Sequence, residues 1–387
     1  MDWLWKVFLA GYVATGTCGS PFVDGQSKPD QQTSQDMPME NPKDPVPPTP
    51  PPPPTKTLSW QKITVPGYQD GVFKKMIGRS RGGPDDVVLL SKGRNNFIKQ
   101  IINRDLSGYS IDFDYKKYLS DYEITDIDLD KDGYVHTVGN TTDNGGRAFR
   151  DGAGPYTLST RCDFGGRYGY PSPSVTKNLV AVHGRTAVGD NGVFFDDNYK
   201  GFCHLFTRDN SSGMGNRAVW RYNSLNGVWV GTNKQFMIGK SNAGSGDLIA
   251  TMPYPVSDPL TGTYPQDITY FEDTMGAGLN AIFGISDTDV MVVGNNATVM
   301  HYDGVKWTDL LVPGDVSGVK FTTVRSTPSG GYIMGAEGGK VLIYSNGEWR
   351  WKIHQLPTTS NVLSVYAWDD QDIYVLADDG LYRYYLH

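Results

Sequence analysis

The sequence has few cysteines and no spacing that is typical of a metal or redox motif. Three cysteines occur in 387 residues, and no CxxC, HxxxH or HExxH pattern is found. Zinc sites of these common types are therefore excluded. Apart from Cys18, the pair Cys162 and Cys203 allows two interpretations, a disulfide in an oxidising compartment or two separate buried thiols.

Helical periodicity and an excess of positive charge are also lacking. Long runs of Ala, Leu, Glu and Lys at helical spacing are absent, whereas 46 glycines and 12% aromatic residues favour strands joined by tight turns. The formal net charge is −7 and no basic stripe is found, which argues against nucleic acid as the main partner.

The N-terminus has the pattern of an export signal. Lys6 precedes an apolar stretch at 7–14, which is too short to span a membrane, and small residues lead to Cys18. The run TGTCGS at 15–20 resembles the lipobox of bacterial lipoproteins, although Thr17 stands where Gly or Ala is usual. This resemblance implies a signal over 1–18 and a lipid on Cys18. Plain secretion and an uncleaved or mis-started N-terminus are the alternatives.

Residues 19–56 are predicted to be a disordered tether. They are rich in Pro, Gln, Ser and Asp, and they end in PVPPTPPPPPTK, so they cannot bury a core. Such a segment would hold a folded domain at 57–387 away from an anchor. An ordinary linker and a docking peptide for polyproline-binding domains are the alternatives.

The C-terminal part of the chain is built from repeats. Three segments share one plan, an apolar strand, a tight polar turn and a second strand that ends near Tyr302, Tyr344 or Tyr384. Each segment follows another apolar run, LNAIFGIS, KFTTVRST or VLSVYAWD, so the repeated unit is a meander of four strands. Four more diverged copies bring the count to seven, with about 47 residues each. This period predicts an all-β, seven-bladed β-propeller of four-stranded antiparallel blades.

The stretch LSWQKITVPGY at 58–68 is predicted to close this ring. It shares the spacing of Trp, Pro and Gly with KWTDLLVPG at 306–314, which has the pattern of a fourth strand. The seventh unit ends after its third strand, so the stretch at 58–67 is expected to supply the outer strand of the last blade and to remove an exposed edge. The alternative is that Trp60 begins an ordinary first strand.

From about Thr57 to its end the chain resembles glycine-rich propeller families of bacterial surface and sensor proteins, namely the two-component-regulator propeller, kelch and sialidase-like repeat types. The resemblance implies the architecture alone, because propellers serve as enzymes, sugar binders and docking platforms.

The segment DIDLDKDGY suggests a calcium loop. Asp128, Asp130 and Asp132 alternate before Gly133, a spacing that suits a hard cation. Gly139 stands where an EF-hand needs glutamate, and His136 stands where the similar loops of integrin-like propellers have an acidic residue. The alternative is a solvated hairpin turn.

The sequence matches the sialidase pattern only in part, so a hydrolase is not favoured. The segment YDGVKW lacks one residue of the sialidase Asp box, and Asn346 replaces the acid in SNGEWRW. No nucleophile elbow, arginine signature or paired histidines supply another catalytic set. We therefore expect that the chain is not an enzyme.

The best candidate for a binding surface is the long, weakly periodic stretch at 141–174. Arginine and tyrosine dominate interface hot spots, and long loops on rigid scaffolds often carry function. The candidate residues are Arg147, Arg150, Tyr156, Arg161, Arg167, Tyr168 and Tyr170. The alternative is that part of this stretch forms the outer strands of the second blade.

These observations predict an exported, lipid-anchored protein of the bacterial envelope, in the periplasm, at the outer membrane or on the cell surface. Its propeller would bind a protein or glycan, with Ca²⁺ as the one cofactor suggested. A carbohydrate-active hydrolase with a site in the central channel and a structural subunit of a larger envelope complex are the alternatives.

Overall fold

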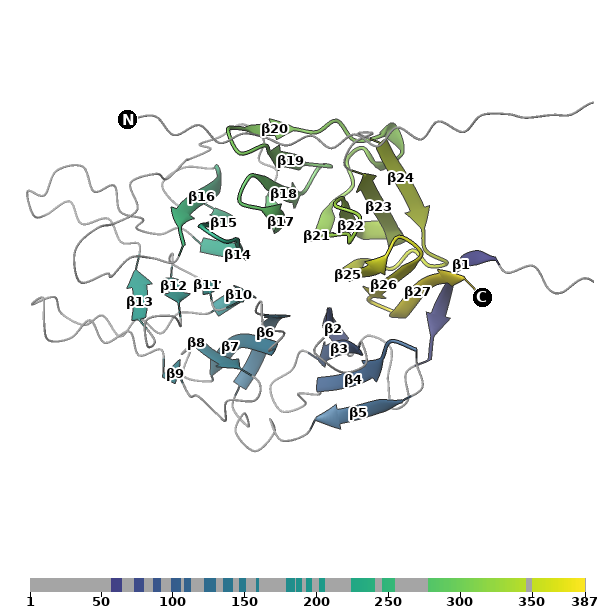
Figure 1. The fold of residues 1–387 in the computed structure, drawn as a ribbon, viewed down its shortest axis with the longest axis horizontal. Coiled ribbons are helices and arrows are strands. Elements are labelled where there is room, and N and C mark those ends of the chain that lie inside the picture. The colour runs from purple at the N-terminus through teal and green to yellow at the C-terminus, as the bar shows by residue number, and fades with distance from the viewer. Residues whose placement is uncertain are drawn as a thin grey trace, which may run out of the picture. The chain divides into compact units, whose positions relative to one another are not determined.

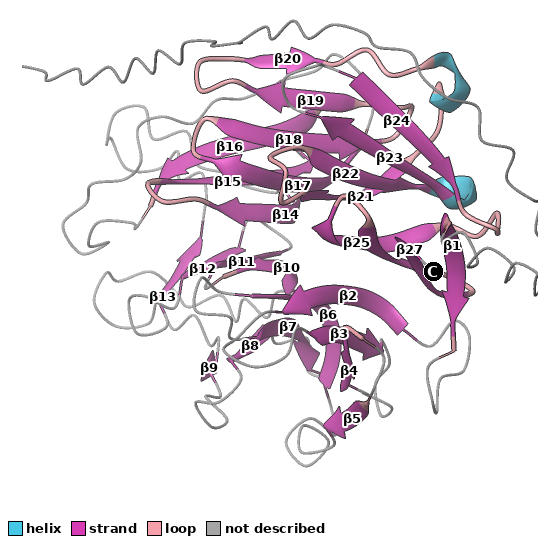
Figure 2. Ribbon diagram, turned by 45° about the vertical axis from the view of Figure 1, so that its right-hand side comes forward, coloured by secondary structure: helices cyan, strands magenta, loops and turns pink. Residues whose placement is uncertain are grey.

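The computed structural model of the chain is built of β-strands. It describes residues 57–64, 73–79, 86–91, 99–105, 108–112, 122–129, 135–141, 146–150, 158–159, 179–184, 186–189, 193–196, 202–205, 224–240, 246–254, 278–345 and 350–386. Within these ranges the only helical turns are two short 3-10 segments, Gly314–Val316 and Glu337–Gly339 (Figure 2). None of the described residues forms a helix long and apolar enough to cross a membrane.

The described strands form seven antiparallel sheets, and the first three follow the chain order (Figure 1). The first sheet contains β2 (Phe73–Arg79), β3 (Asp86–Ser91), β4 (Lys99–Asn103) and β5 (Tyr109–Asp112). The second contains β6 (Tyr122–Leu129), β7 (Val135–Thr141), β8 (Gly146–Arg150) and β9 (Leu158–Ser159). The third contains β10 (Leu179–His183), β11 (Thr186–Gly189), β12 (Val193–Asp196) and β13 (Phe202–Leu205).

The fourth sheet differs from the predicted plan, because the described residues supply three of its strands. These are β14 (Ser224–Val230), β15 (Lys234–Lys240) and β16 (Asp247–Pro253), and residues 255–277 after them lie outside the described ranges. The fifth sheet contains β17 (Leu279–Ser286), β18 (Asp289–Gly294), β19 (Val299–Tyr302) and β20 (Trp307–Asp309). The sixth contains β21 (Phe321–Ser326), β22 (Tyr332–Ala336), β23 (Lys340–Ser345) and β24 (Arg350–Gln355).

The seventh sheet combines the two ends of the described chain. It contains β25 (Val362–Asp369), β26 (Asp372–Ala377), β27 (Gly380–Leu386) and, on the outside, β1 (Leu58–Ile63). β1 pairs antiparallel with β27 in a register that joins Leu58 to Leu386 and Ile63 to Leu381. This is the pairing that the spacing of Trp, Pro and Gly predicts.

The first strand of each sheet contacts the first strand of the next. The contacts run from β2 to β6, β10, β14, β17, β21 and β25, and β25 contacts β2 in turn. Apolar clusters fill the spaces between adjacent sheets, such as the cluster of the sixth and seventh sheets onto which Leu58 and Trp60 of β1 pack. Seven similar units therefore share cores in sequence order.

Every first strand carries a β-bulge at the same place, directly after a buried apolar residue. These residues are Phe73, Ile124, Leu179, Leu225, Leu279, Phe321 and Val362. Their partners on the second strand are small, namely Ser91, Gly139, Gly189, Gly239, Gly294, Ala336 and Ala377. At Gly239 an added Cβ would collide with the backbone carbonyl of Ser224, so the bulge requires a residue without a side chain there.

The bulged residue often ties its sheet to the next one. Thr125 Oγ1 donates a hydrogen bond to the carbonyl of Leu179 at 2.7 Å, and Asn280 Nδ2 donates to the carbonyl of Phe321 at 2.8 Å. Asn226 and Thr322 make the same contact with Leu279 and Val362. A short polar side chain at the bulge thus satisfies a carbonyl of the neighbouring first strand.

Candidate functional site: the central layer

The bulges align the seven first strands and define a layer of side chains. Counting four residues on from the buried residue before each bulge reaches one position per sheet, which we call the central layer. Its members are Ile77, Asp128, His183, Trp229, Phe283, Arg325 and Tyr366. Several side chains at this shared position contact one another, since Arg325 meets Asp128 and Phe283, and His183 meets Phe283 and Trp229.

An ion pair spans this layer. Arg325 Nη1 of the sixth sheet donates a hydrogen bond to Asp128 Oδ2 of the second sheet at 2.9 Å. These sheets are not adjacent in the order of first-strand contacts, so the pair links first strands that do not contact each other directly. Burial by itself lowers the pKa of Arg325, but the Asp128 carboxylate outweighs burial and raises that pKa. Arg325 therefore stays charged.

Aromatic rings pack around this ion pair. The guanidinium carbon of Arg325 lies 4.7 Å from the ring centroid of Phe283, a cation–π distance, and the His183 ring meets Phe283 edge-on at 5.5 Å. His183 Nδ1 accepts a hydrogen bond from the Val230 backbone N–H at 3.1 Å. Because burial lowers the pKa of His183 and Nδ1 is occupied as an acceptor, the imidazole is neutral.

A second ion pair lies two residues before the central layer on the first and second sheets. Lys75 Nζ is 3.0 Å from Asp126 Oδ1, and Asp126 Oδ2 accepts a hydrogen bond from the Val182 backbone N–H at 3.0 Å. The Lys75 side chain is 41% exposed, whereas that of Asp126 is 12% exposed. Asp126 and Asp128 thus each face a cation.

The structure shows one of the three predicted calcium ligands. Asp128 is buried in β6 and binds Arg325, while Asp130 and Asp132 lie outside the described residues. The described residues contain no cluster of three or more metal-ligating side chains. The carboxylate of Asp128 is thus engaged by a guanidinium, and calcium binding by the set of three stays a prediction.

The predicted binding surface is described in part. Arg147 and Arg150 belong to β8, where their backbones pair with Gly139 and His136. The remaining candidates lie outside the described residues, namely Tyr156, Arg161, Arg167, Tyr168 and Tyr170. This placement agrees with the alternative that part of the stretch forms an outer strand of the second sheet.

The cysteine predictions lie mostly outside the described ranges. Cys203 is in β13, where its backbone pairs with Phe195. Cys162 and the predicted lipid-bearing Cys18 are outside the described residues, so the disulfide and the lipid anchor stay predictions.

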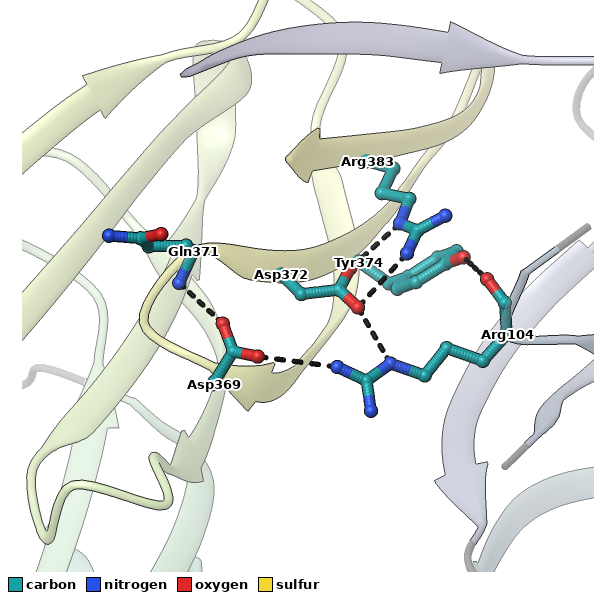
Figure 3. A network of polar contacts seen from close by, with 6 residues as sticks. All are labelled: Arg104, Asp369, Gln371, Asp372, Tyr374 and Arg383. Atoms are coloured by element: carbon teal, nitrogen blue, oxygen red, sulfur yellow. Dashed lines mark hydrogen bonds and ion pairs between the residues drawn. The ribbon is translucent and has the colours of Figure 1, made fainter. Parts of the chain in front are cut away.

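A charged network joins the seventh sheet to the first (Figure 3). Asp372 accepts hydrogen bonds from Arg383 Nε at 2.7 Å and Nη2 at 3.0 Å, and from Arg104 Nε at 2.7 Å. Arg104 also reaches Asp369 at 3.3 Å, and its carbonyl accepts a hydrogen bond from the Tyr374 hydroxyl at 2.7 Å. Arg104 follows β4, so this network fastens the first sheet to the last one.

Sequence reasoning missed Arg325 and the Arg104 network. Arg325 left a signal, because it is a charged residue within the apolar first-strand run KFTTVRST. Arg104 left none, since its partner Asp372 is 268 residues away in the chain.

Comparison with known proteins identifies the fold and no family. No protein-family model matches the chain, and no curated protein sequence matches it. Among solved structures, YCF48 from Cyanidioschyzon merolae is similar with a TM-score of 0.53 and 15% identity over 84% of this chain and 98% of that one. The chain has a β-propeller fold.

Two other proteins are similar to this propeller. A catalytically inactive virginiamycin B lyase from Staphylococcus aureus with quinupristin has a TM-score of 0.52 and 12% identity over 86% of this chain and all of that one. The WD40 propeller domain of Doa1 has a TM-score of 0.50 and 13% identity over 84% of this chain and 96% of that one. YCF48 has also been solved bound to a D1 peptide, with a TM-score of 0.51 and 14% identity over 84% and 94% of the two chains. At these identities the likeness concerns the fold alone.

Proposed function

We propose that the chain is a closed, seven-bladed propeller that works as a protein-binding platform at the bacterial cell envelope. Two observations support the ring, namely the cycle of contacts from β2 through β25 back to β2, and the pairing of β1 with β27. In this proposal the lipidated Cys18 and the tether at 19–56 hold the propeller at a membrane surface.

The ion pair across the central layer is the observation that favours a platform over an enzyme. Arg325 and Asp128 neutralise each other, and Lys75 and Asp126 do the same. Catalysis by paired carboxylates needs one that can donate a proton and one that is free to attack or to activate water. Because the central charges are satisfied internally, recognition is expected on the outer surfaces of the ring.

The partner in this proposal is a protein with an acidic surface or a glycan with carboxylate groups. Arg147, Arg150, Arg161 and Arg167 lie within a short stretch of a chain whose net charge is −7. Guanidinium groups bind carboxylates in a bidentate manner, and tyrosines add contact area at low entropic cost. A propeller of the same fold, YCF48, has been solved with a bound peptide.

Affinity purification from the native envelope tests this proposal. The full-length protein should retain a stable partner, and replacing the four arginines by glutamate should abolish its recovery. A control in which the exposed Lys306 and Lys320 become glutamate should keep the partner, because these lysines lie in the connections before β20 and β21 and not in the stretch at 141–174. Loss of the partner in both variants, or retention in both, would contradict the assignment of the surface.

A hydrolase or lyase with a central site is the second candidate. It is favoured by the gathering of Asp126, Asp128, His183 and Arg325 from three sheets. In that case a substrate carboxylate would replace Asp128 as the partner of Arg325. Turnover of any member of a panel of glycosides and lactones, lost on replacing Arg325 with Met, would replace the platform by this candidate.

A further inference from the structure

An aromatic cluster holds β1 against two sheets. The centroid of the Trp60 ring lies 5.1 Å from that of Tyr384 in β27 and 6.0 Å from that of His354 in β24. The rings of His354 and Tyr384 are 4.9 Å apart and meet edge to face. The cluster therefore ties the first strand of the chain to the last strand and to the outer strand of the sixth sheet.

Two ring nitrogens are buried within this cluster. Trp60 Nε1 and His354 Nε2 have almost no contact with solvent, and neither has a hydrogen-bond partner among the described residues. A buried polar atom without a partner costs about 1 to 3 kcal/mol. Opening the cluster would return both atoms to water, so this cost favours opening.

Among the described residues, the one charged group that acts on His354 is the cation Lys352. β1 contributes the Trp60 ring and β27 the Tyr384 ring, and on β23 Val341 is the register partner of His354. Lys352, which is on β24 with His354, places its ammonium 5.9 Å from the centroid of the Tyr384 ring. Burial and then the charge of Lys352 lower the pKa of His354 to about 4. Protonation of His354 is therefore less favourable in the closed cluster than in the open one.

We propose that β1 is an acid-released strand: proton uptake by the imidazole of His354 opens the aromatic cluster and detaches β1 from β27. Among the described strands β1 lies at the edge of its sheet and pairs with β27 alone, so its release breaks one described strand pair. Release frees the chain up to the start of β2 at Phe73, which lengthens the connection to residues 1–57 by about 50 Å at full extension. The longer reach of an anchored platform rests on the proposed function, whereas the release of β1 does not.

The sign and size of the effect follow from linkage. The pKa of His354 is about 4 in the closed cluster, and an exposed histidine titrates near pH 6.5. The closed state is fully favoured above about pH 6.5, and this advantage is lost as the pH falls toward 4. Between pH 7 and pH 5 the open fraction should rise about 20-fold.

Hydrogen exchange of the full-length protein, followed by mass spectrometry, tests the proposal. After correction for intrinsic rates, exchange in β1 and β27 should rise about 20-fold from pH 7 to pH 5, while β22 and β23 stay protected. His354→Phe keeps an aromatic ring that cannot titrate and should abolish the rise. The matched control His301→Gln removes a histidine from the fifth sheet and should leave the rise intact.

Two results would overturn the proposal. One is the absence of a rise in the wild-type protein, which would mean that the aromatic faces stabilise the imidazolium. The other is a rise that persists in His354→Phe. If His354→Phe does not fold, a disulfide between cysteines replacing Ser59 and Tyr385, which are register partners, should suppress the rise instead. The exchange experiment uses no binding partner. Either of these results would therefore overturn the release of β1 and leave the proposed function to the affinity purification.

Discussion

Two junctions between sheets use the same strand positions with different chemistry. Asp289 begins β18 and Asp372 begins β26. Two residues further along each strand, Met291 pairs with His301 of β19 and Tyr374 pairs with Arg383 of β27. His301 and Arg383 therefore occupy equivalent positions on the third strands. Asp289 lies 2.8 Å from His301 Nε2 and accepts a hydrogen bond from the Tyr332 hydroxyl of the sixth sheet at 2.6 Å. Asp372 instead binds two guanidinium groups, those of Arg383 and Arg104.

The two junctions differ in how far apart their strands lie in the sequence. The fifth and sixth sheets are joined by a short connection, from Asp309 at the end of β20 to Phe321. The seventh and first sheets are joined through β1 and the connection at 64–72, but β25, β26 and β27 meet the first sheet only after nearly the whole domain has folded, so that contact closes a long loop at a larger entropic cost. Both junctions use a carboxylate, but only Asp372 has two permanently charged partners, and these bonds hold together strands that lie far apart in the chain.

The largest expected effect comes from Asp372→Asn. The change keeps the shape of the side chain but removes the carboxylate that Arg383 and Arg104 share, so that Arg104 retains only Asp369, and we expect a loss of about 3 to 5 kcal/mol in the free energy of unfolding. Urea unfolding measures it. The matched change Asp289→Asn should cost about 1 to 2 kcal/mol, because its partners are a hydroxyl and an imidazole. Equal costs would show that the two junctions do not differ as proposed.

Arg383→Lys should have a smaller effect at the same junction. Lysine keeps the charge but cannot make the two parallel hydrogen bonds from Nε and Nη2 to Asp372, so we expect a loss of about 1 to 2 kcal/mol. The same unfolding experiment measures it. A neutral result would mean that charge alone, without the bidentate geometry, holds the junction.

Tyr332→Phe should weaken the junction of the fifth and sixth sheets by about 1 kcal/mol at pH 7. Burial alone would raise the pKa of Asp289, but the hydrogen bonds from His301 and Tyr332 hold that pKa below its ordinary value. The stability that this carboxylate contributes is present above about pH 4 and is lost as the pH falls through its folded pKa. The difference in the free energy of unfolding between variant and wild type, measured by urea unfolding, should therefore narrow as the pH falls through the folded pKa of Asp289, and a difference that is constant with pH would contradict this assignment.

The smallest effect is expected at a bulge between sheets. Asn280→Ala removes the hydrogen bonds to the Phe321 carbonyl and to Asn295, at an expected cost of about 0.5 to 1.5 kcal/mol in thermal unfolding. Val180 occupies the bulge of the third sheet, and Val180→Ala serves as a control without that hydrogen bond. If Asn280→Ala loses no more stability than Val180→Ala, the hydrogen bond at the bulge contributes nothing beyond the packing of the side chain.

Much of the fold could be predicted from local patterns. Apolar runs, glycine turns and a recurring Tyr or Trp predicted strands in units of similar length, and seven described sheets correspond to the seven units. The partner of β1 was predictable because SWQKITVPG and KWTDLLVPG share one spacing. The fourth sheet is the exception, since the residues after β16 follow no repeat that the pattern could place.

The candidate site was less predictable because its charges act across the domain. Asp128 has the local context of a calcium loop, and nothing near it in the sequence indicates Arg325 as its partner, 197 residues away. The candidate arginines at 147–167 were predicted because their stretch is rich in arginine and tyrosine. This richness does not indicate which surface of the domain these residues form.

Local patterns predict the strand plan and the repeat, because alternation and turn residues act between neighbours in the chain, and the repeat in turn predicts the pairing of β1. Which charges meet depends on how the sheets come together in three dimensions. The first strands converge, so equivalent positions of different sheets face one another in a confined space where an unpaired charge is costly. Arg325 and Asp128 are partners for that reason, and the same constraint pairs Asp372 with two arginines where the last sheet meets the first.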